Sequence, residues 1–256
     1  MLSIEEAGQG SPVVLLHGLT ATKRYVVHGS RHLERHGFRV IAYDARGHGG
    51  SDPAGAYSDE ELAADLLGVL DGRGVERAIL AGASMGAHTI VRFALDHPER
   101  VAALVVITPA FAPEGVDQEP VVARYDRLAA GLESGGVEGF VAAYGDPPVP
   151  ERFKETVRTV LRQRLSRHAH PEAVAEALRQ VPRSAAFGAW SDLAGIDAPA
   201  VVVASRDEAD PEHPYAVGER YAAEIRGARL VSEDPGESPL AWQGSRLSRV
   251  IAGAEG

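Results

Sequence analysis

Short apolar runs alternate along this chain with longer segments whose apolar residues recur at helical spacing. Runs at residues 13–16, 40–43, 78–81, 103–107 and 201–204 are typical of strands buried on both faces, and 229–231 predicts a shorter last strand. The intervening patterns predict helices over residues 24–36, 62–70, 86–96, 214–225 and 240–252. The alternation therefore predicts an α/β protein with a mostly parallel, doubly wound sheet.

One long segment interrupts this alternation. Between about residues 112 and 190 the sequence contains helical patterns separated by Gly- and Pro-rich breaks, and no strand pattern. The segment falls before the last two strands, whose ends should carry an active site. Its length favours a helical cap over ordinary sheet-covering helices. We therefore expect a core made of residues 1–111 and 191–256, with a cap at 112–190.

Composition excludes several classes of function. The 256 residues include no cysteine, so disulfides, thiolate metal sites and cysteine nucleophiles are ruled out. A net charge of −10 argues against nucleic acid as a partner. No apolar run approaches membrane-spanning length, and the first residues do not resemble a signal peptide. We expect a cytoplasmic protein with no membrane partner; the sequence leaves the oligomeric state open.

A G-x-S-x-G motif at Gly82–Gly86 contains the candidate reactive residue of the chain. It follows a predicted strand and opens a predicted helix, which is the context in which this motif makes a sharp turn. The glycines allow close backbone approach, and the turn lifts the hydroxyl of Ser84 above the sheet edge. The helix N-terminus behind it stabilises negative charge. Ser84 is therefore the candidate nucleophile.

Two further motifs extend the pattern. His17-Gly18-Leu19 resembles an HG-x oxyanion loop, and the segment from Asp44 to Ser51 resembles a D-x-R-G-x-G-x-S turn. Together with the G-x-S-x-G turn, in this order and spacing, they make the chain resemble the α/β-hydrolase superfamily, particularly its capped, esterase-like members. The resemblance covers nearly the whole length. It implies that the backbone N–H groups of Leu19 and Met85 form the oxyanion hole, each contributing about 3 kcal/mol of transition-state stabilisation.

The order of catalytic groups in this superfamily is serine, acid, histidine. The acid is expected just beyond the strand at 201–204, where Asp207 and Asp210 are both candidates. Asp207 lies nearer the strand end, whereas Asp210, followed by Pro211, fits the local pattern better. An Asp before a proline-started helix is also a common N-cap, which offers Asp210 a purely structural role.

The expected histidine is missing from its usual place after the last strand. Glu237 occupies that slot, and no histidine follows His213. A solvated glutamate has a pKa near 4.3, about 2–3 units from the best value for a base at neutral pH. His213, in the same loop as the candidate acids, is the alternative base, although it is equally compatible with a solvated imidazole at a helix start.

These residues predict a hydrolase for a small acyl substrate such as an ester, with an atypical base and no cofactor. The alternatives are a cofactor-free lyase, isomerase or cyclase, or a ligand-binding pseudoenzyme. No histidine pair has metal-ligand spacing with a carboxylate, so we expect no metal site. The cap is rich in arginine, which indicates either a solvated helix face or a site for a carboxylate-bearing substrate; these are Arg152, Arg158, Arg162, Arg164, Arg167, Arg179 and Arg183.

Overall fold

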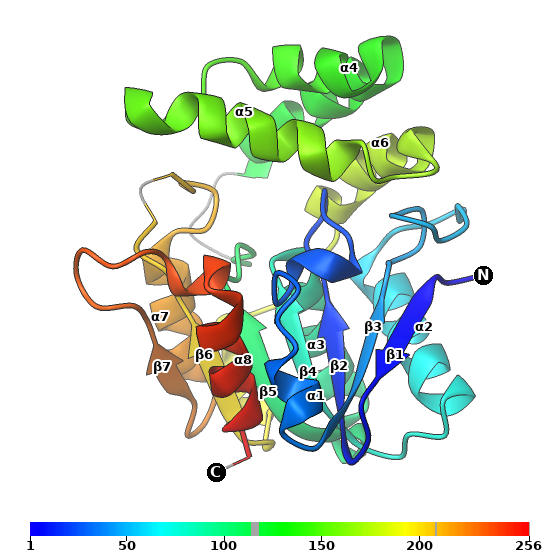
Figure 1. Ribbon diagram of the computed structural model, residues 1–256, viewed down its shortest axis with the longest axis vertical. Helices are drawn as coiled ribbons and strands as arrows, with labels where there is room; N and C mark the ends of the chain where they lie inside the picture. Colours follow the sequence, from blue (N-terminus) through cyan, green and yellow to red (C-terminus); the bar gives the residue numbers. More distant parts are fainter. Residues whose placement is uncertain (114–117, 208, 256) are drawn as a thin grey trace.

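A computed structural model describes residues 1–113, 118–207 and 209–255. Within these residues, seven strands form one sheet in the order β1-β3-β2-β4-β5-β6-β7 (Figure 1). All neighbouring strands are parallel except β1, which runs antiparallel to β3. The strand bounds are β1 Ile4–Ala7, β2 Ser11–Leu16, β3 Phe38–Tyr43, β4 Ala78–Ala83, β5 Val101–Ile107, β6 Ala200–Val203 and β7 Arg229–Val231. The expected α/β class and mostly parallel sheet are confirmed.

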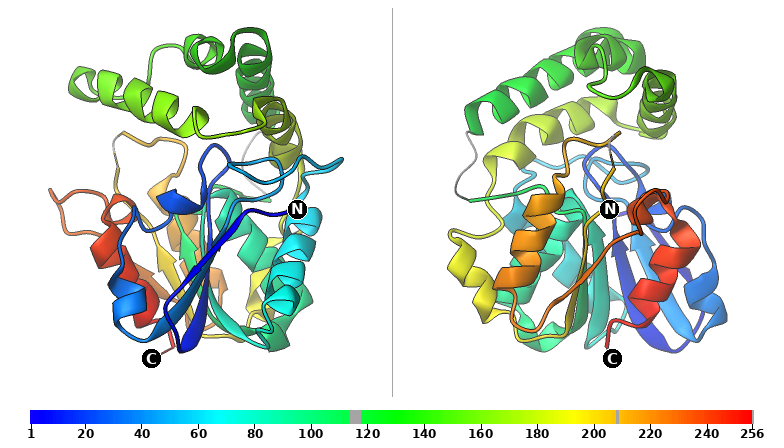
Figure 2. Two further views of the ribbon diagram at one scale, coloured as in Figure 1. Left: turned by 45° about the vertical axis from the view of Figure 1, so that its right-hand side comes forward. Right: turned by 90° about the vertical axis from the view of Figure 1, so that its left-hand side faces the viewer.

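Helices cover both faces of the sheet (Figure 2). One face packs against α1 (His32–Arg35) and α8 (Gly244–Ala252), whose Leu33, Leu247 and Ile251 join alternate residues of the central strands in one apolar cluster. The other face packs against α2 (Asp59–Gly72), α3 (Met85–Asp96) and α7 (Tyr215–Glu224). Because the central strands are buried on both sides, they are almost continuously apolar.

The cap predicted before the last two strands is present. It contains α4 (Gln118–Tyr144), α5 (Glu151–Leu165) and α6 (Pro171–Gln180), which Figure 1 shows above the sheet. A kink at Gly136, where φ is 59°, divides α4 and lets its two parts pack against each other. The apolar cluster of the cap extends to core residues beside the site, Leu19 and Met85 among them. The cap therefore contacts the catalytic edge directly.

Two local expectations differ from the structure. Residues 24–36 do not form one helix: a 3₁₀ turn at Lys23–Tyr25 and the short α1 are separated by His28 and Gly29, which both have positive φ and so end the helical path. The predicted strands also omit β1, whose IEEA sequence is only half apolar because the strand lies at the sheet edge. Among the described helices, none combines the length and the apolar character needed to cross a bilayer.

Candidate active site

Ser84 lies on a strained turn between the central strand β4 and helix α3. Its φ of 53° and ψ of −113° are unusual for a residue with a side chain, and such strain costs on the order of 1–3 kcal/mol. Both flanking glycines are required by close contact. A Cβ on Gly82 would lie 2.1 Å from the carbonyl oxygen of Gly86, and a Cβ on Gly86 would lie 2.4 Å from that of Leu16. The motif therefore builds the predicted turn.

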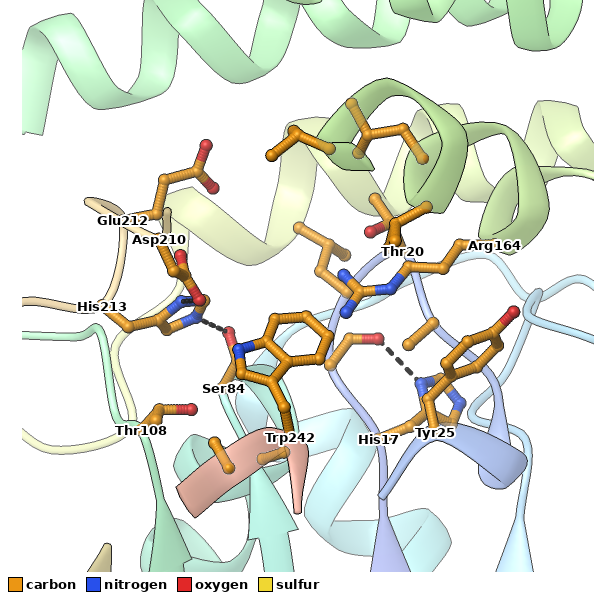
Figure 3. Close-up of a pocket in the computed structure, with 18 of the residues that line it drawn as sticks. His17, Thr20, Tyr25, Ser84, Thr108, Arg164, Asp210, Glu212, His213 and Trp242 are labelled. Atoms are coloured by element: carbon orange, nitrogen blue, oxygen red, sulfur yellow. Dashed lines mark hydrogen bonds and ion pairs between the residues drawn. The ribbon is translucent and has the colours of Figure 1, made fainter. Parts of the chain in front are cut away.

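His213 and Asp210 complete a hydrogen-bonded chain with Ser84 (Figure 3). The Nε2 atom of His213 lies 2.8 Å from the Ser84 Oγ, and its Nδ1 lies 2.8 Å from the Asp210 Oδ2. Both partners come from the loop after β6, two strands away from β4 in the sheet. Such a hydrogen-bonded chain can act chemically as a nucleophile, a base and an orienting acid.

The acid sets the electrostatics of the base. Burial acts to lower the pKa of His213, but the hydrogen bond and the charge of Asp210 outweigh it, so the pKa is raised above 6.5. For Asp210, burial acts to raise the pKa, and the hydrogen bond with His213 reverses this and lowers it. An ionised Asp210 thus stabilises the imidazolium that forms when His213 accepts a proton.

The oxyanion loop is held against Ser84 by histidines of the core and the cap. A Cβ on Gly18 would lie 3.3 Å from the Ser84 Cβ, so the loop passes beside the nucleophile. His48 Nε2 lies 2.6 Å from the Leu19 carbonyl oxygen, and His168 of the cap lies 3.2 Å from that of Thr20. Met85 begins α3, where backbone N–H groups have no carbonyl partner within the helix.

The other carboxylates predicted at the site have different partners. A cavity above Ser84 is lined by Asp207 as well as by Asp210 and His213. The two carboxylate oxygens of Asp207 accept hydrogen bonds from the Trp242 indole, at 2.7 Å, and from the Ala209 amide. Glu237 lies outside the cavity lining, its side chain is 44% exposed, and it forms an ion pair with Arg246. The structure does not bring Glu237 to Ser84. Asp210 does not cap α7 either, because that helix begins at Tyr215 with Pro214 at its N-cap.

The remaining histidines near the turn have structural contacts. His17 accepts a hydrogen bond from the Ala45 amide, and His88 accepts from the amides of Ala110 and Phe111. Burial lowers the pKa of each to about 3, so both stay neutral. Sequence analysis missed Trp242 and Thr108 as lining residues; Thr108, with a φ of 41°, ends β5 as Ser84 ends β4.

Comparison with known proteins identifies the family to which this fold belongs. The family model described as "alpha/beta hydrolase fold" matches residues 11–188. The chain belongs to this family.

Relatives within the family span several reactions. A Pseudomonas putida protein named 2-hydroxy-6-oxononadienedioate/2-hydroxy-6-oxononatrienedioate hydrolase 2 is 31% identical, over 93% of this chain and 82% of its own length. Epoxide hydrolase B of Mycobacterium tuberculosis is 41% identical over 42% of this chain. That match spans only 31% of the epoxide hydrolase, and a phage relative is likewise matched over less than half of its length.

Solved structures of hydrolases superpose over almost the whole chain. A thermophilic esterase from Thermogutta terrifontis, solved with malate bound, has a TM-score of 0.80 and 26% identity, covering 98% of this chain and 91% of the esterase. An enol-lactonase from Burkholderia xenovorans LB400 has a TM-score of 0.73 and 26% identity, covering 91% and 88%. Both similarities therefore extend over most of the chain.

Proposed function

We propose that this protein is a serine hydrolase acting on an ester or related acyl substrate, with Ser84 as nucleophile, His213 as base and Asp210 as acid. The observation that carries the proposal is the pair of 2.8 Å contacts of His213, one to Ser84 and one to Asp210. The names of two structurally similar proteins, an esterase and an enol-lactonase, support the same substrate class.

The reaction follows from the positions of these groups. Ser84 Oγ attacks the substrate carbonyl carbon while its proton passes to His213 Nε2. The N–H groups of Leu19 and Met85 stabilise the negative oxygen that develops. Collapse breaks the bond to the leaving alcohol, which takes the proton from His213 and leaves an acyl group on Ser84. A water molecule, deprotonated by His213, then releases the carboxylic acid and restores the serine hydroxyl.

This assignment removes the reason for the non-hydrolytic alternatives. The lyase, isomerase, cyclase and pseudoenzyme alternatives depend on a histidine that is missing from the loop after the last strand, and the 2.8 Å contact of His213 with Ser84 supports a histidine base supplied by another loop. A base other than histidine is therefore unnecessary.

The test is hydrolysis of p-nitrophenyl butyrate by the wild-type protein and by Ser84→Ala. We expect Ser84→Ala to lower kcat by roughly 10³-fold or more, because the acyl-enzyme cannot form. In parallel, a fluorophosphonate probe should label the wild type on Ser84 and leave the variant unlabelled. Ester turnover that survives in Ser84→Ala, or labelling at another residue, would refute the proposal.

A further inference from the structure

Four arginines of the cap form ion pairs on its surface: Arg158 with Asp146, Arg162 with Glu138, Arg179 with Glu133 and Arg183 with Asp126. These side chains are between 30% and 46% exposed, and they form the solvated helix face that an arginine-rich segment usually provides. They carry no indication of a ligand.

Arg164 differs from them in direction, burial and partners. It extends from α5 into the cavity above Ser84, where Figure 3 shows it between Thr20 and Tyr25. Its guanidinium carbon lies 5.0 Å from the ring centre of Trp242 and 5.6 Å from that of Tyr25. Its Nε is buried and, within the described part of the chain, has no hydrogen-bond partner. Burial lowers the pKa of this guanidinium below its ordinary value.

The carboxylates of the same cavity are engaged elsewhere. Asp210 is bonded to His213, and Glu212 forms an ion pair with Arg124 and lies 3.5 Å from the Tyr125 hydroxyl. Arg164 therefore contributes a fixed positive charge, stacked on aromatic rings, with no ion pair of its own among the described residues. Burying a cation in this way is costly unless an anion joins it.

We propose that Arg164 binds a carboxylate group of the substrate, so that the preferred substrates are esters whose acyl part carries a free carboxylate. A guanidinium matches a carboxylate with two parallel hydrogen bonds, which favours a carboxylate over a less well-matched anion. This inference rests on the proposed function, because it places the ester bond of the same molecule at Ser84.

A second cavity defines where the rest of the substrate lies. It also contains Ser84 and has a volume of about 340 Å³, equal to that of the Arg164 cavity. Its wall is mostly apolar, with Phe111, Val121, Val181 and Val217, and its arginine, Arg124, is neutralised by Glu212. The serine thus lies between two cavities, of which the first contains Arg164, without an ion pair in the described ranges, and the ester is divided between them.

The experiment compares two esters and three proteins. The esters are p-nitrophenyl butyrate and the p-nitrophenyl half-ester of succinic acid, which differ at the end of the acyl chain. The proteins are the wild type, Arg164→Gln and the matched control Arg162→Gln, which removes the same charge from the exposed face of α5. The quantity measured is kcat/KM for the succinate ester divided by kcat/KM for the butyrate ester.

We expect Arg164→Gln to lower this ratio by about tenfold or more, mainly through a higher KM, as for loss of a charge-assisted hydrogen bond. Arg162→Gln should leave the ratio within about twofold, and Arg164→Lys should give an intermediate value, since a point charge lacks the planar fork. The p-nitrophenyl half-esters of glutaric and adipic acid extend the series to longer acyl chains. Arg164→Gln should lower kcat/KM most for the half-ester that the wild type hydrolyses best. A ratio that Arg164→Gln leaves unchanged across the series would overturn the proposal.

Failure of the proposed function gives a different result. If neither ester is turned over in a Ser84-dependent way, the hydrolase assignment is lost, and the carboxylate site is then tested by binding alone. Calorimetry of succinate monomethyl ester with Ser84→Ala, and with Ser84→Ala combined with Arg164→Gln, supplies that test. Weaker binding to the double variant by about tenfold or more supports the site, and equal affinity refutes it.

Discussion

The loops after β6 and β7 contribute to the candidate site differently from what the resemblance implies. The loop after β6 carries Asp210 and His213, whose side chains are only 25% and 19% exposed and contact each other and Ser84. The loop after β7, where the resemblance places the histidine, instead carries the exposed Glu237, paired with Arg246. Position in the chain is therefore a weaker guide to a catalytic role than the point in space to which a loop delivers its side chain.

The contrast between the two loops is tested most directly by replacing the proposed base, His213, and Glu237, which occupies the usual position of the histidine. His213→Ala should lower kcat for p-nitrophenyl butyrate by about 100-fold or more, because no other group would accept the serine proton. Glu237→Gln should change kcat by less than about twofold, because its carboxylate contacts Arg246 on the surface. The reverse order of effects would return the base to the loop after β7.

The next test separates the two candidate acids within the loop after β6. Asp210→Asn should lower kcat by about 100-fold, because the imidazole loses the charge that stabilises its protonated form. Asp207→Asn should cost less than tenfold, because Asp207 bonds Trp242 and Ala209. Equal losses for both variants would show that the loop conformation, and not the Asp210 carboxylate, is what matters.

The pH profile sharpens the same distinction. His213 acts as a base only when neutral, so kcat/KM should rise with pH through a pKa that Asp210 holds above 6.5. In Asp210→Asn the carboxylate charge that raises this pKa is gone, whereas burial, which lowers it, remains. The acid limb should therefore move to lower pH in Asp210→Asn, whereas it should stay in place in Asp207→Asn. A limb that does not move would exclude His213 as the titrating group.

The smallest effect concerns Glu233, which ties the two loops together. Its buried carboxylate accepts hydrogen bonds from the amide of Arg206 after β6 and from that of Leu240 after β7. Glu233→Gln should lower the free energy of unfolding by about 1–3 kcal/mol, whereas its exposed neighbour Asp234→Asn should have little effect.

The sign of the pH dependence checks the role of the Glu233 charge. Burial acts to raise its pKa, but the hydrogen bonds from Leu240 and Arg206 outweigh it and lower the pKa below 4.5. The stabilisation is therefore present at neutral pH and lost as the pH falls below about 4.5 towards the folded-state pKa. In urea titrations, the difference in the free energy of unfolding between the wild type and Glu233→Gln should shrink below about pH 4.5. A difference that persists at low pH would mean that the stabilisation comes from the packing of the side chain and not from its charge.

Much of the fold could be predicted because its signals are local. The apolar runs that become β2 to β6 and the turn from Gly82 to Gly86 depend on residues adjacent in the chain. The base could not be assigned in the same way, because whether His213 points at Ser84 depends on the path of an irregular loop between Pro211 and Pro214. The signal was present in Asp210 and His213, three residues apart, but spacing alone does not distinguish a catalytic pair from a solvated one.

Arg164 was missed as an individual residue for a similar reason. The buried residues Leu161 and Leu165 mark the inner side of α5, but Arg158 and Arg164 both lie three residues from Leu161, so helical periodicity does not distinguish them. Arg158 and Arg162 point outward to ion pairs. What the periodicity does not give is the tilt of α5 over the core, which decides whether an inward arginine meets apolar residues or a cavity.

Because acid and base share one short loop, their mutual geometry is fixed within four consecutive residues. In the proposed mechanism, the last strand β7 and helix α8 supply no reacting group. An insertion or deletion between residues 204 and 214 would instead displace both partners of the serine at once.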